Sequence, residues 1–373
     1  MKKLGFGLMR LPLNDNSKDD SDIDYEQVCK MVDHFLEKGF TYFDTAYPYH
    51  RGFSEVFLKK TLVDRHPRDS FVVANKMPTF SVTKSEDYQR LFDEQTEKCG
   101  VDYFDYYMLH ALNLARYESS IKLGGFEFMK QLKASGKVKH IGLSFHDTAD
   151  VLDTILTNQP EMEFVQLQIN YLDWESENVQ ARKCYEVAKK HNKIIIIMEP
   201  IKGGALANVP EEAKTLLKDY HPDMSVSSWA MRHCASFDDV VMVLSGMSNM
   251  EQMEDNTSYM QDFVPLNQTE QDIILKVTDI INGTAIIPCT LCKYCDDSCP
   301  KNIPIHSYFS MYNKAKQFNQ VPAQKTHYKN LSNSENIGTA SSCIRCKKCE
   351  RHCPQNIRIH KSLKDVALLL ENN

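Results

Sequence analysis

Four ionisable side chains follow three successive apolar, strand-like segments in the first third of the chain. They are Asp44 and Tyr49 after residues 39–43, Lys76 after residues 71–75, and His110 after residues 104–109. Taken alone, such a carboxylate is most often a helix cap or a surface charge, and such a phenol is usually half-buried packing. Their occurrence together at consecutive strand ends makes the four residues a candidate catalytic set.

This set resembles the catalytic tetrad of the aldo-keto reductases, and the resemblance extends from the first residues to about Pro265. It implies a TIM barrel, whose active site lies at the carboxyl ends of the strands. In the chemistry that the family performs, a nicotinamide hydride reduces a carbonyl and the resulting alkoxide needs a proton. Tyr49 would supply this proton, and Lys76 would lower the phenol's pKa from its ordinary value of about 10. Asp44 would keep Lys76 charged and oriented, and His110 would polarise the carbonyl oxygen.

Eight of the twelve cysteines crowd into the last quarter of the chain in two runs of the form Cys-x2-Cys-x2-Cys-x3-Cys-Pro. The runs are Cys289, Cys292, Cys295 and Cys299, and then Cys343, Cys346, Cys349 and Cys353. This is the ferredoxin spacing for [4Fe–4S] clusters. Zinc also binds Cys-x2-Cys pairs, but it has no need of the third cysteine or the Cys-Pro step. We therefore predict two [4Fe–4S] clusters.

In two-cluster ferredoxins the fourth cysteine of each run binds the other cluster. We expect one cluster on Cys289, Cys292, Cys295 and Cys353, and the other on Cys343, Cys346, Cys349 and Cys299. The repeat continues beyond the cysteines, with His306 and His360 as matching residues expected to pack or to form hydrogen bonds rather than to bind metal. The scattered Cys29, Cys99, Cys184 and Cys234 are expected to be small buried apolar side chains.

Eight predicted strands alternate with predicted helices, which is the pattern of a (β/α)8 barrel. The strands are expected within residues 3–12, 39–43, 71–76, 104–110, 138–144, 164–168, 194–198 and 240–244. Asp24, with Gln27 three positions later, predicts the start of the first helix, and Gly39 predicts its end. We assign residues 1–265 to the barrel, 266–285 to a linker helix, and 286–373 to a small α+β ferredoxin-like domain with two clusters.

The resemblance also implies where a nicotinamide nucleotide binds. Ser144 and Gln166 match family residues for the carboxamide, but Phe145 replaces the family's asparagine and Met198 replaces its stacking tyrosine. Plain core packing of Phe145 and Met198 is the alternative reading. The remaining predicted contacts are Gly203 and Gly204 for the pyrophosphate, and Ser245, Gly246, Met247, Gln252, Asp255 and Asn256 for the adenosine.

The predicted adenosine segment contains no lysine or arginine between His233 and Leu275. A 2′-phosphate there would lack the charged partners that it normally has. The sequence therefore favours NADH over NADPH.

The composition excludes several other classes of protein. The net charge of −6 argues against non-specific nucleic-acid binding, and no apolar run approaches the roughly 18 residues of a membrane span. The first residues lack the apolar core of a secretory signal, and the clustered cysteines indicate a reducing compartment. We therefore expect a cytoplasmic enzyme.

These features predict an oxidoreductase that reduces or oxidises a carbonyl or alcohol with NAD(P)H and passes electrons through two clusters. Nicotinamide moves two electrons as a hydride and each cluster moves one, so a flavin is a natural intermediary, although no flavin motif is evident. One alternative is an electron-transfer module whose barrel holds a nucleotide or flavin, reduces no carbonyl, and serves a redox partner protein. A weaker alternative gives the clusters a structural role only.

Overall fold

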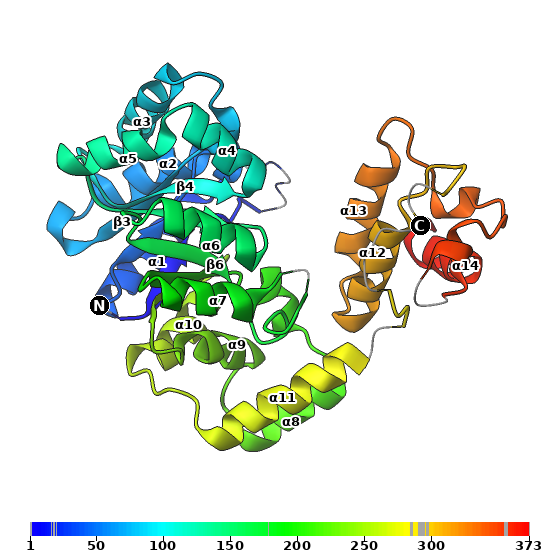
Figure 1. Ribbon diagram of the computed structural model, residues 1–373. Helices are drawn as coiled ribbons and strands as arrows, with labels where there is room; N and C mark the ends of the chain where they lie inside the picture. Colours follow the sequence, from blue (N-terminus) through cyan, green and yellow to red (C-terminus); the bar gives the residue numbers. More distant parts are fainter. Residues whose placement is uncertain are drawn as a thin grey trace. The chain divides into compact units, whose positions relative to one another are not determined.

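Eight short parallel strands close into a barrel, and helices surround them (Figure 1). The computed structural model describes residues 2–15, 17, 19, 21–177, 179–283, 286–289, 295, 298–353 and 357–372. The strands are β1 (Leu4–Gly7), β2 (Tyr42–Asp44), β3 (Val72–Met77), β4 (Phe104–Leu112), β5 (Val138–Phe145), β6 (Phe164–Gln168), β7 (Ile194–Met198) and β8 (Val240–Ser245). Each strand pairs with the next in the chain, and β8 pairs with β1. Each overlaps its predicted segment, so the predicted barrel is confirmed.

Helices separate the strands along the chain. They are α1 (Tyr25–Glu37), α2 (Phe53–Leu58), α3 (Glu86–Cys99), α4 (Leu114–Lys122), α5 (Gly125–Ala134), α6 (Ala149–Asn158), α7 (Ala181–Lys190), α8 (Glu211–Tyr220), α9 (Val226–Ala235), α10 (Met250–Gln261) and α11 (Gln268–Gly283). At the start of α1, the Asp24 carboxylate accepts a hydrogen bond from the Gln27 backbone N–H at 2.9 Å, as the sequence predicts. None of the described helices has the length and hydropathy needed to cross a membrane.

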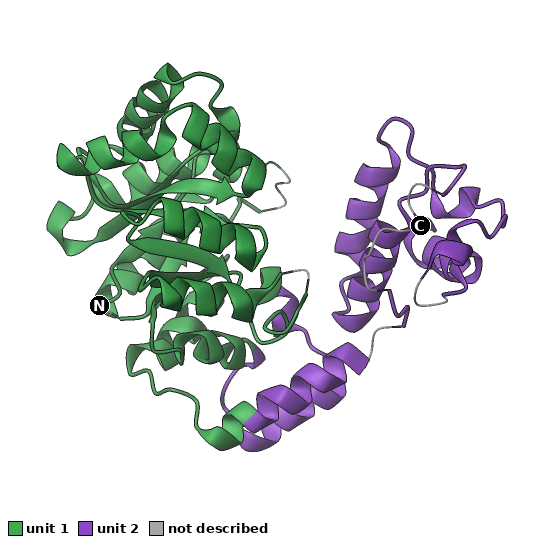
Figure 2. Cartoon of the chain, viewed as in Figure 1, with its two compact units in different colours: residues 1–203, 227–271 green, residues 204–226, 272–373 purple. Residues whose placement is uncertain are grey.

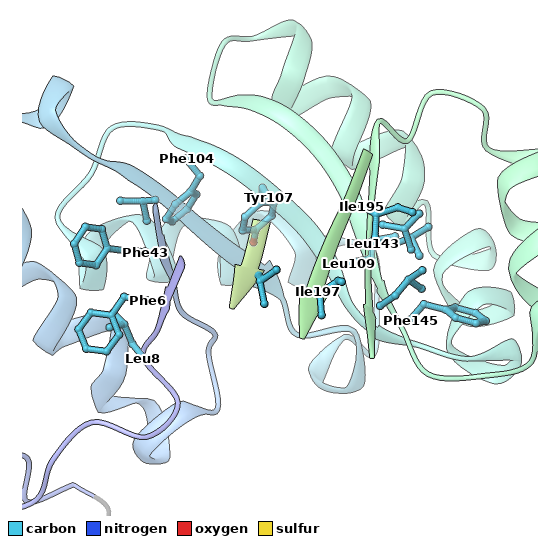
Figure 3. Packing of buried hydrophobic residues seen from close by; sticks show 14 of the residues in the cluster. Phe6, Leu8, Phe43, Phe104, Tyr107, Leu109, Leu143, Phe145, Ile195 and Ile197 are labelled. Atoms are coloured by element: carbon cyan, nitrogen blue, oxygen red, sulfur yellow. The ribbon is translucent and has the colours of Figure 1, made fainter. Parts of the chain in front are cut away.

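Side chains alternate along each strand between the inside of the barrel and the layer of helices. The inward cluster consists of Tyr42, Ala74, Met108, Phe164, Ile196, Met242 and Leu244. The neighbouring residues of the same strands face outward and pack under the helices; several of them, including Phe43, Leu109, Leu143 and Ile197, are drawn in Figure 3. This alternation also fixes which residues at the strand ends point into the barrel mouth.

The chain divides into two compact units, which Figure 2 colours separately. The first consists of residues 1–203 and 227–271 and contains all eight strands. The second consists of residues 204–226 and 272–373, so it includes α8 and most of α11 as well as the region of the two cysteine runs. Helix α11 covers most of the predicted linker at residues 266–285.

The C-terminal region is built from α12 (Ile305–Gln317), α13 (Val321–Ser332) and α14 (Ile359–Leu370). Their apolar faces pack together with cysteine side chains in one hydrophobic core, which includes Tyr308, Phe309, Tyr328, Leu363 and Val366. The described residues from 286 to 372 are helical, turn or irregular. The β-component expected for this α+β domain therefore lies in none of them, and α12 and α13 occupy most of the 43 residues between Cys299 and Cys343.

Candidate functional site

All the predicted catalytic and nicotinamide residues except Tyr49 follow an inward-facing residue by two positions at the end of a strand, so they lie at one end of the barrel. Tyr49 lies in the turn after β2. Asp44 follows Tyr42, Lys76 follows Ala74, His110 follows Met108, Gln166 follows Phe164, and Met198 follows Ile196. Ser144 follows Gly142 in the same way, and an added side chain at Gly142 would come within 2.4 Å of the Phe164 carbonyl oxygen.

Asp44 and Lys76 form a buried ion pair at the centre of this end. The Lys76 Nζ donates to an Asp44 carboxylate oxygen at 2.5 Å and to the Thr45 carbonyl oxygen at 2.8 Å. Neither side chain is more than 3% exposed. Burial acts to lower the pKa of Lys76, but the attraction of Asp44 and Tyr49 outweighs it and raises that pKa. Lys76 is thus held as a cation that cannot leave without stranding a buried carboxylate.

Tyr49 lies against this pair and beside His110. The Lys76 Nζ is 4.9 Å from the centre of the Tyr49 ring, and the Tyr49 and His110 rings meet edge to face at 6.2 Å between centres. Burial raises the pKa of Tyr49, and the charge and hydrogen bond of Lys76 act in the opposite direction. Lys76 therefore acts to lower the pKa of the phenol, as the sequence predicts. The effect of burial on this pKa is larger, so Tyr49 keeps its proton.

His110 is held as a neutral imidazole. Burial, followed by the repulsion of Lys76, lowers its pKa to about 3. Its Nδ1 is buried and has no hydrogen-bond partner among the described residues. A neutral imidazole can donate a hydrogen bond to a carbonyl oxygen without adding a second charge beside Lys76.

We expect the neutral state of His110 to appear in the pH dependence of the enzyme. In carbonyl reduction, kcat/KM should show no inflection near pH 6.5, where an ordinary histidine titrates. The same lowered pKa makes the free energy of unfolding depend on pH. Below about pH 6.5, His110 takes up a proton in the unfolded chain but not in the folded chain. The contribution of His110 to stability is therefore complete above pH 6.5 and falls as the pH drops toward 3. An inflection near pH 6.5 that disappears in His110→Gln would contradict this assignment.

The turn after Tyr49 is held in an unusual backbone conformation. The φ angles of His50, Arg51 and Gly52 are 49°, 54° and 92°. Residues other than glycine rarely adopt positive φ angles. The His50 Nε2 accepts a hydrogen bond from the Leu11 backbone N–H at 3.0 Å. This contact ties the loop after β1 to the turn that carries the phenol, and so helps to fix the position of Tyr49.

A buried network centred on Glu55, which the sequence analysis did not identify, supports Lys76 from behind. The Glu55 Oε1 accepts hydrogen bonds from the Asn75 and Gln95 side-chain amides at 2.9 and 2.8 Å. The Gln95 amide also donates to the Lys76 carbonyl oxygen at 3.0 Å, and the Tyr107 hydroxyl donates to Gln95 at 2.6 Å. A glutamate six positions after Tyr49, on a predicted helix, gave no separate signal in the sequence.

Glu55→Ala should lower the free energy of unfolding by about 2–4 kcal/mol, because it opens a cavity and removes one acceptor from each of two buried amides. Glu55→Gln is the matched control, since it keeps the size of the side chain and one acceptor oxygen. Denaturant unfolding of both variants measures the difference. Equal losses in the two variants would show that the negative charge, rather than the hydrogen bonds, is what matters.

The residues expected around a nicotinamide include one buried atom that lacks a partner. The Gln166 Oε1 is buried and accepts no hydrogen bond from any described residue, while its Nε2 lies 3.5 Å from the Met198 sulfur. Ser144 is also buried, and Met198 is partly exposed. An acceptor left open in this way fits the amide of a nicotinamide carboxamide. The Phe145 side chain points away from the barrel interior and packs in the core between the strands and the helices (Figure 3), as the packing interpretation of this residue predicts.

The loop after β7 has open, left-handed backbone. Gly203 and Gly204 have φ angles of 64° and 93°, and no atom lies within 4 Å of where a side chain on Gly204 would begin. Arg10, an exposed residue after β1, brings its guanidinium to 3.3 Å from the corresponding point on Gly203 and packs along Gly246. Sequence reasoning did not identify Arg10, because only the barrel places the loop after β1 beside the loops after β7 and β8.

The predicted adenosine residues follow β8. The Asn256 amide donates to the Ser245 hydroxyl at 2.8 Å, and the Gln252 side chain accepts from the Ser248 backbone N–H at 2.9 Å. Asp255 is 3.4 Å from the Ser227 hydroxyl. The Met247 side chain packs into the outer core, so only its backbone faces the loop. Their role in nucleotide binding stays a prediction.

In the second unit, Cys299 from the first run lies with three cysteines of the second. Cys299, Cys343, Cys346 and Cys349 line one pocket together with apolar side chains such as Ile303, Ile305 and Leu363. This is the set expected for one cluster from crossed ligation. Arg345 and Lys347, on either side of Cys346, have φ angles of 58° and 59°. Residues with left-handed backbone next to residues with right-handed backbone direct successive N–H groups toward an anion, as in many iron–sulfur sites. The pocket therefore fits a thiolate-bound cluster.

The remaining predicted ligands are only partly described. Cys289, Cys295 and Cys353 pack at the same apolar cluster of the second unit, and Cys292 lies outside the described residues. Among the described residues, no three His, Cys, Asp or Glu side chains are placed to share a single metal ion. His360 contacts Glu350 at 2.6 Å and His306 contacts Ser307 at 3.0 Å, which agrees with the predicted hydrogen-bonding role of both histidines.

Comparison with known families identifies both parts of the chain. Residues 3–279 match the aldo/keto reductase family, and residues 288–357 match a 4Fe-4S dicluster domain. A curated relative, described as a probable aldo-keto reductase 1 from Glycine max, is 30% identical over 155 residues. That match spans 39% of this chain and only 41% of the soybean protein.

Solved structures share the fold of the barrel at low sequence identity. The holo form of an aldo-keto reductase from Bacillus halodurans is 22% identical, with a TM-score of 0.60 over 74% of this chain and 91% of that one. An aldo-keto reductase from Klebsiella pneumoniae in complex with NADPH is 16% identical, with a TM-score of 0.59 over 74% of this chain and 90% of that one. At these identities the likeness establishes the fold and not the substrate.

Proposed function

The chain belongs to the aldo/keto reductase family, and from that premise we propose that it reduces or oxidises a carbonyl or alcohol with NAD(P)H and exchanges electrons through two [4Fe–4S] clusters. The observation that carries the first part is the buried Asp44–Lys76 pair, with Tyr49 and His110 beside it.

In this proposal the four residues divide the work on one oxygen atom. His110, neutral and with its Nδ1 unpartnered among the described residues, polarises the carbonyl oxygen. Tyr49 gives its proton to that oxygen as negative charge develops, and Lys76 stabilises the phenolate that remains. Asp44 keeps Lys76 protonated and in place. In the direction of alcohol oxidation, the same residues take the proton back.

A bound nicotinamide nucleotide would supply the hydride. Gln166 and Ser144 would hold its carboxamide, and the open backbone at Gly203 and Gly204 would accept its pyrophosphate. Ser245, Gly246, Met247, Gln252, Asp255 and Asn256 would surround the adenosine.

The clusters need their own ligands and a link to a two-electron donor. We assign Cys343, Cys346, Cys349 and Cys299 to one cluster, supported by the pocket that these four residues line. Cys289, Cys292, Cys295 and Cys353 hold the other. Hydride transfer moves two electrons and a cluster accepts one, so a bound flavin is the proposed intermediary.

Absorbance spectra of anaerobically purified protein test this function. Addition of NADH should bleach the iron–sulfur band, and a separate flavin band would identify the intermediary. Carbonyl reduction without any bleaching would leave the clusters with a structural role. Bleaching without reduction of any carbonyl would instead favour an electron-transfer module that serves a partner protein.

NADH should bind at least as tightly as NADPH. Residues 233–275 contain no lysine or arginine, and the ammonium of Lys202, in the loop after β7, is held by the Asp173 carboxylate. A 2′-phosphate would thus find no free cation from this segment. Titration of both nucleotides at the same ionic strength measures the preference.

A tenfold preference for NADPH, equivalent to about 1.4 kcal/mol, would contradict this expectation. Arg10 is then the residue to test, because its guanidinium lies beside Gly203 and Gly246. If Arg10 contacts the pyrophosphate, Arg10→Ala should weaken both nucleotides by a similar factor. If it contacts a 2′-phosphate, only NADPH should bind more weakly.

A further inference from the structure

The two cysteine runs have the same spacing but opposite charge. The run from Cys343 to His352 carries four basic residues and one acidic residue, a formal charge of +3. The run from Cys289 to Ser298 carries one lysine and two aspartates, a formal charge of −1. The ligand pattern requires no such difference, so the charge of the second run calls for another explanation.

Two basic side chains line the cysteine pocket: Lys301, just after the first run, and Lys347, in the second run. We call these two, together with Arg345, Lys348 and Arg351 of the second run, the basic rim. All five are exposed, and Lys301 and Lys347 line the same pocket as Cys346, which is exposed itself. A cluster bound by Cys346 would therefore lie close to solvent at a positively charged surface.

The charge of the basic rim is not used within the described part of the second unit. None of its five residues forms an ion pair with a described acidic side chain. The only acidic residue of the run, Glu350, is mostly buried and contacts His360 at 2.6 Å. Such a surface stands out on a chain whose net charge is −6.

The basic rim also has an exposed apolar neighbour. Ile344 is 57% exposed and lines the same pocket as Lys301 and Lys347. An exposed apolar residue surrounded by charges is the usual composition of a protein interface, with a core and a polar rim. Nucleic acid or lipid headgroups would match the charge but would give Ile344 no specific contact.

We propose that the basic rim is the docking surface for a small acidic electron-carrier protein. The proposal rests on the function given above and adds the chemistry of the partner. Attraction between opposite charges speeds encounter and orients a partner over the surface nearest to its redox centre, and small, weak interfaces are typical of such carriers.

Binding of an acidic plant-type [2Fe–2S] ferredoxin to the full-length, iron-loaded protein tests the proposal. Titrations are made at ionic strengths of about 0.01 M and about 1 M, where the screening length falls from about 30 Å to about 3 Å. We expect saturable binding at low ionic strength that is weakened at least tenfold at high ionic strength. A basic carrier, cytochrome c, should bind more weakly than the ferredoxin at low ionic strength.

A charge-reversed double variant locates the site. Lys347→Glu combined with Lys348→Glu should weaken ferredoxin binding at least tenfold at low ionic strength. Lys30→Glu combined with Lys122→Glu is the matched control, because both lysines are exposed on barrel helices and the net charge changes equally. The iron content of the charge-reversed variant is measured first. If it is lower than in the unmodified protein, the combination of Lys347→Gln and Lys348→Gln is used instead, and this variant should weaken ferredoxin binding about threefold or more.

Equal binding by the two double variants, or binding that does not depend on salt, would overturn the proposal. So would a surface that binds duplex DNA or anionic vesicles but not the ferredoxin, with the loss again confined to the Lys347 and Lys348 variant. Because binding requires neither NADH nor substrate, a failure of NADH to bleach the clusters would reject the proposed electron route and leave this docking result standing.

Discussion

Tyr49→Phe is expected to lower carbonyl reduction by at least about a hundredfold, which is the usual scale for loss of a general acid. The phenyl ring fills the same space against Lys76 and keeps the edge-to-face contact with His110, whose ring centre is 6.2 Å away. Only the hydroxyl is lost. The fall should therefore appear in kcat, with the affinity for the nucleotide unchanged.

Tyr47→Phe is the matched control, because it removes a phenol hydroxyl only two residues away. The Tyr47 hydroxyl donates to Glu94 at 3.1 Å. Steady-state rates of both variants with one good substrate, together with nucleotide titrations, make the comparison. If Tyr49→Phe retains the rate of the control, Tyr49 is not the acid and the proposed mechanism fails at its first step.

The barrel could be predicted because each strand has a strong local pattern. The alternation of inward and outward residues then fixes the site: Asp44, Lys76 and His110 each follow an inward residue, and the sequence alone places them at strand ends. The direction of the Lys76 effect on Tyr49 could also be predicted. The dominance of burial in the Tyr49 pKa could not, because it depends on the enclosure of the ring by distant segments.

Residues that act through tertiary contacts left no local signal. Glu55 accepts hydrogen bonds from Asn75 and Gln95, and the three residues lie on three different elements. Arg10 lies in the loop after β1 and contacts Gly203 and Gly246. Helix α4 occupies much of the connection between β4 and α5. The inclusion of residues 204–226 in the second compact unit likewise depends on packing that no pattern in that segment reveals.

Cys299→Ala tests the crossed ligation of the clusters. Cys299 belongs to the first run by sequence, but it lines a pocket with Cys343, Cys346 and Cys349 of the second. Its loss should therefore damage the same cluster that Cys349→Ala damages. Iron should fall from about eight per chain toward about four in both variants, since each cluster holds four iron atoms.

Spectra of the reduced variants distinguish the two clusters where iron content alone does not. Under crossed ligation, the electron paramagnetic resonance spectrum of Cys299→Ala should resemble that of Cys349→Ala and differ from that of Cys295→Ala, which removes a ligand of the first run. Cys234→Ala is the control for loss of a buried thiol, because Cys234 is fully buried in the barrel and should leave about eight iron atoms in place. A Cys299→Ala spectrum that matches Cys295→Ala would assign Cys299 to its own run. Zinc in place of iron in the unmodified protein would reject the clusters altogether, because the four cysteines of the pocket would then serve a single structural ion.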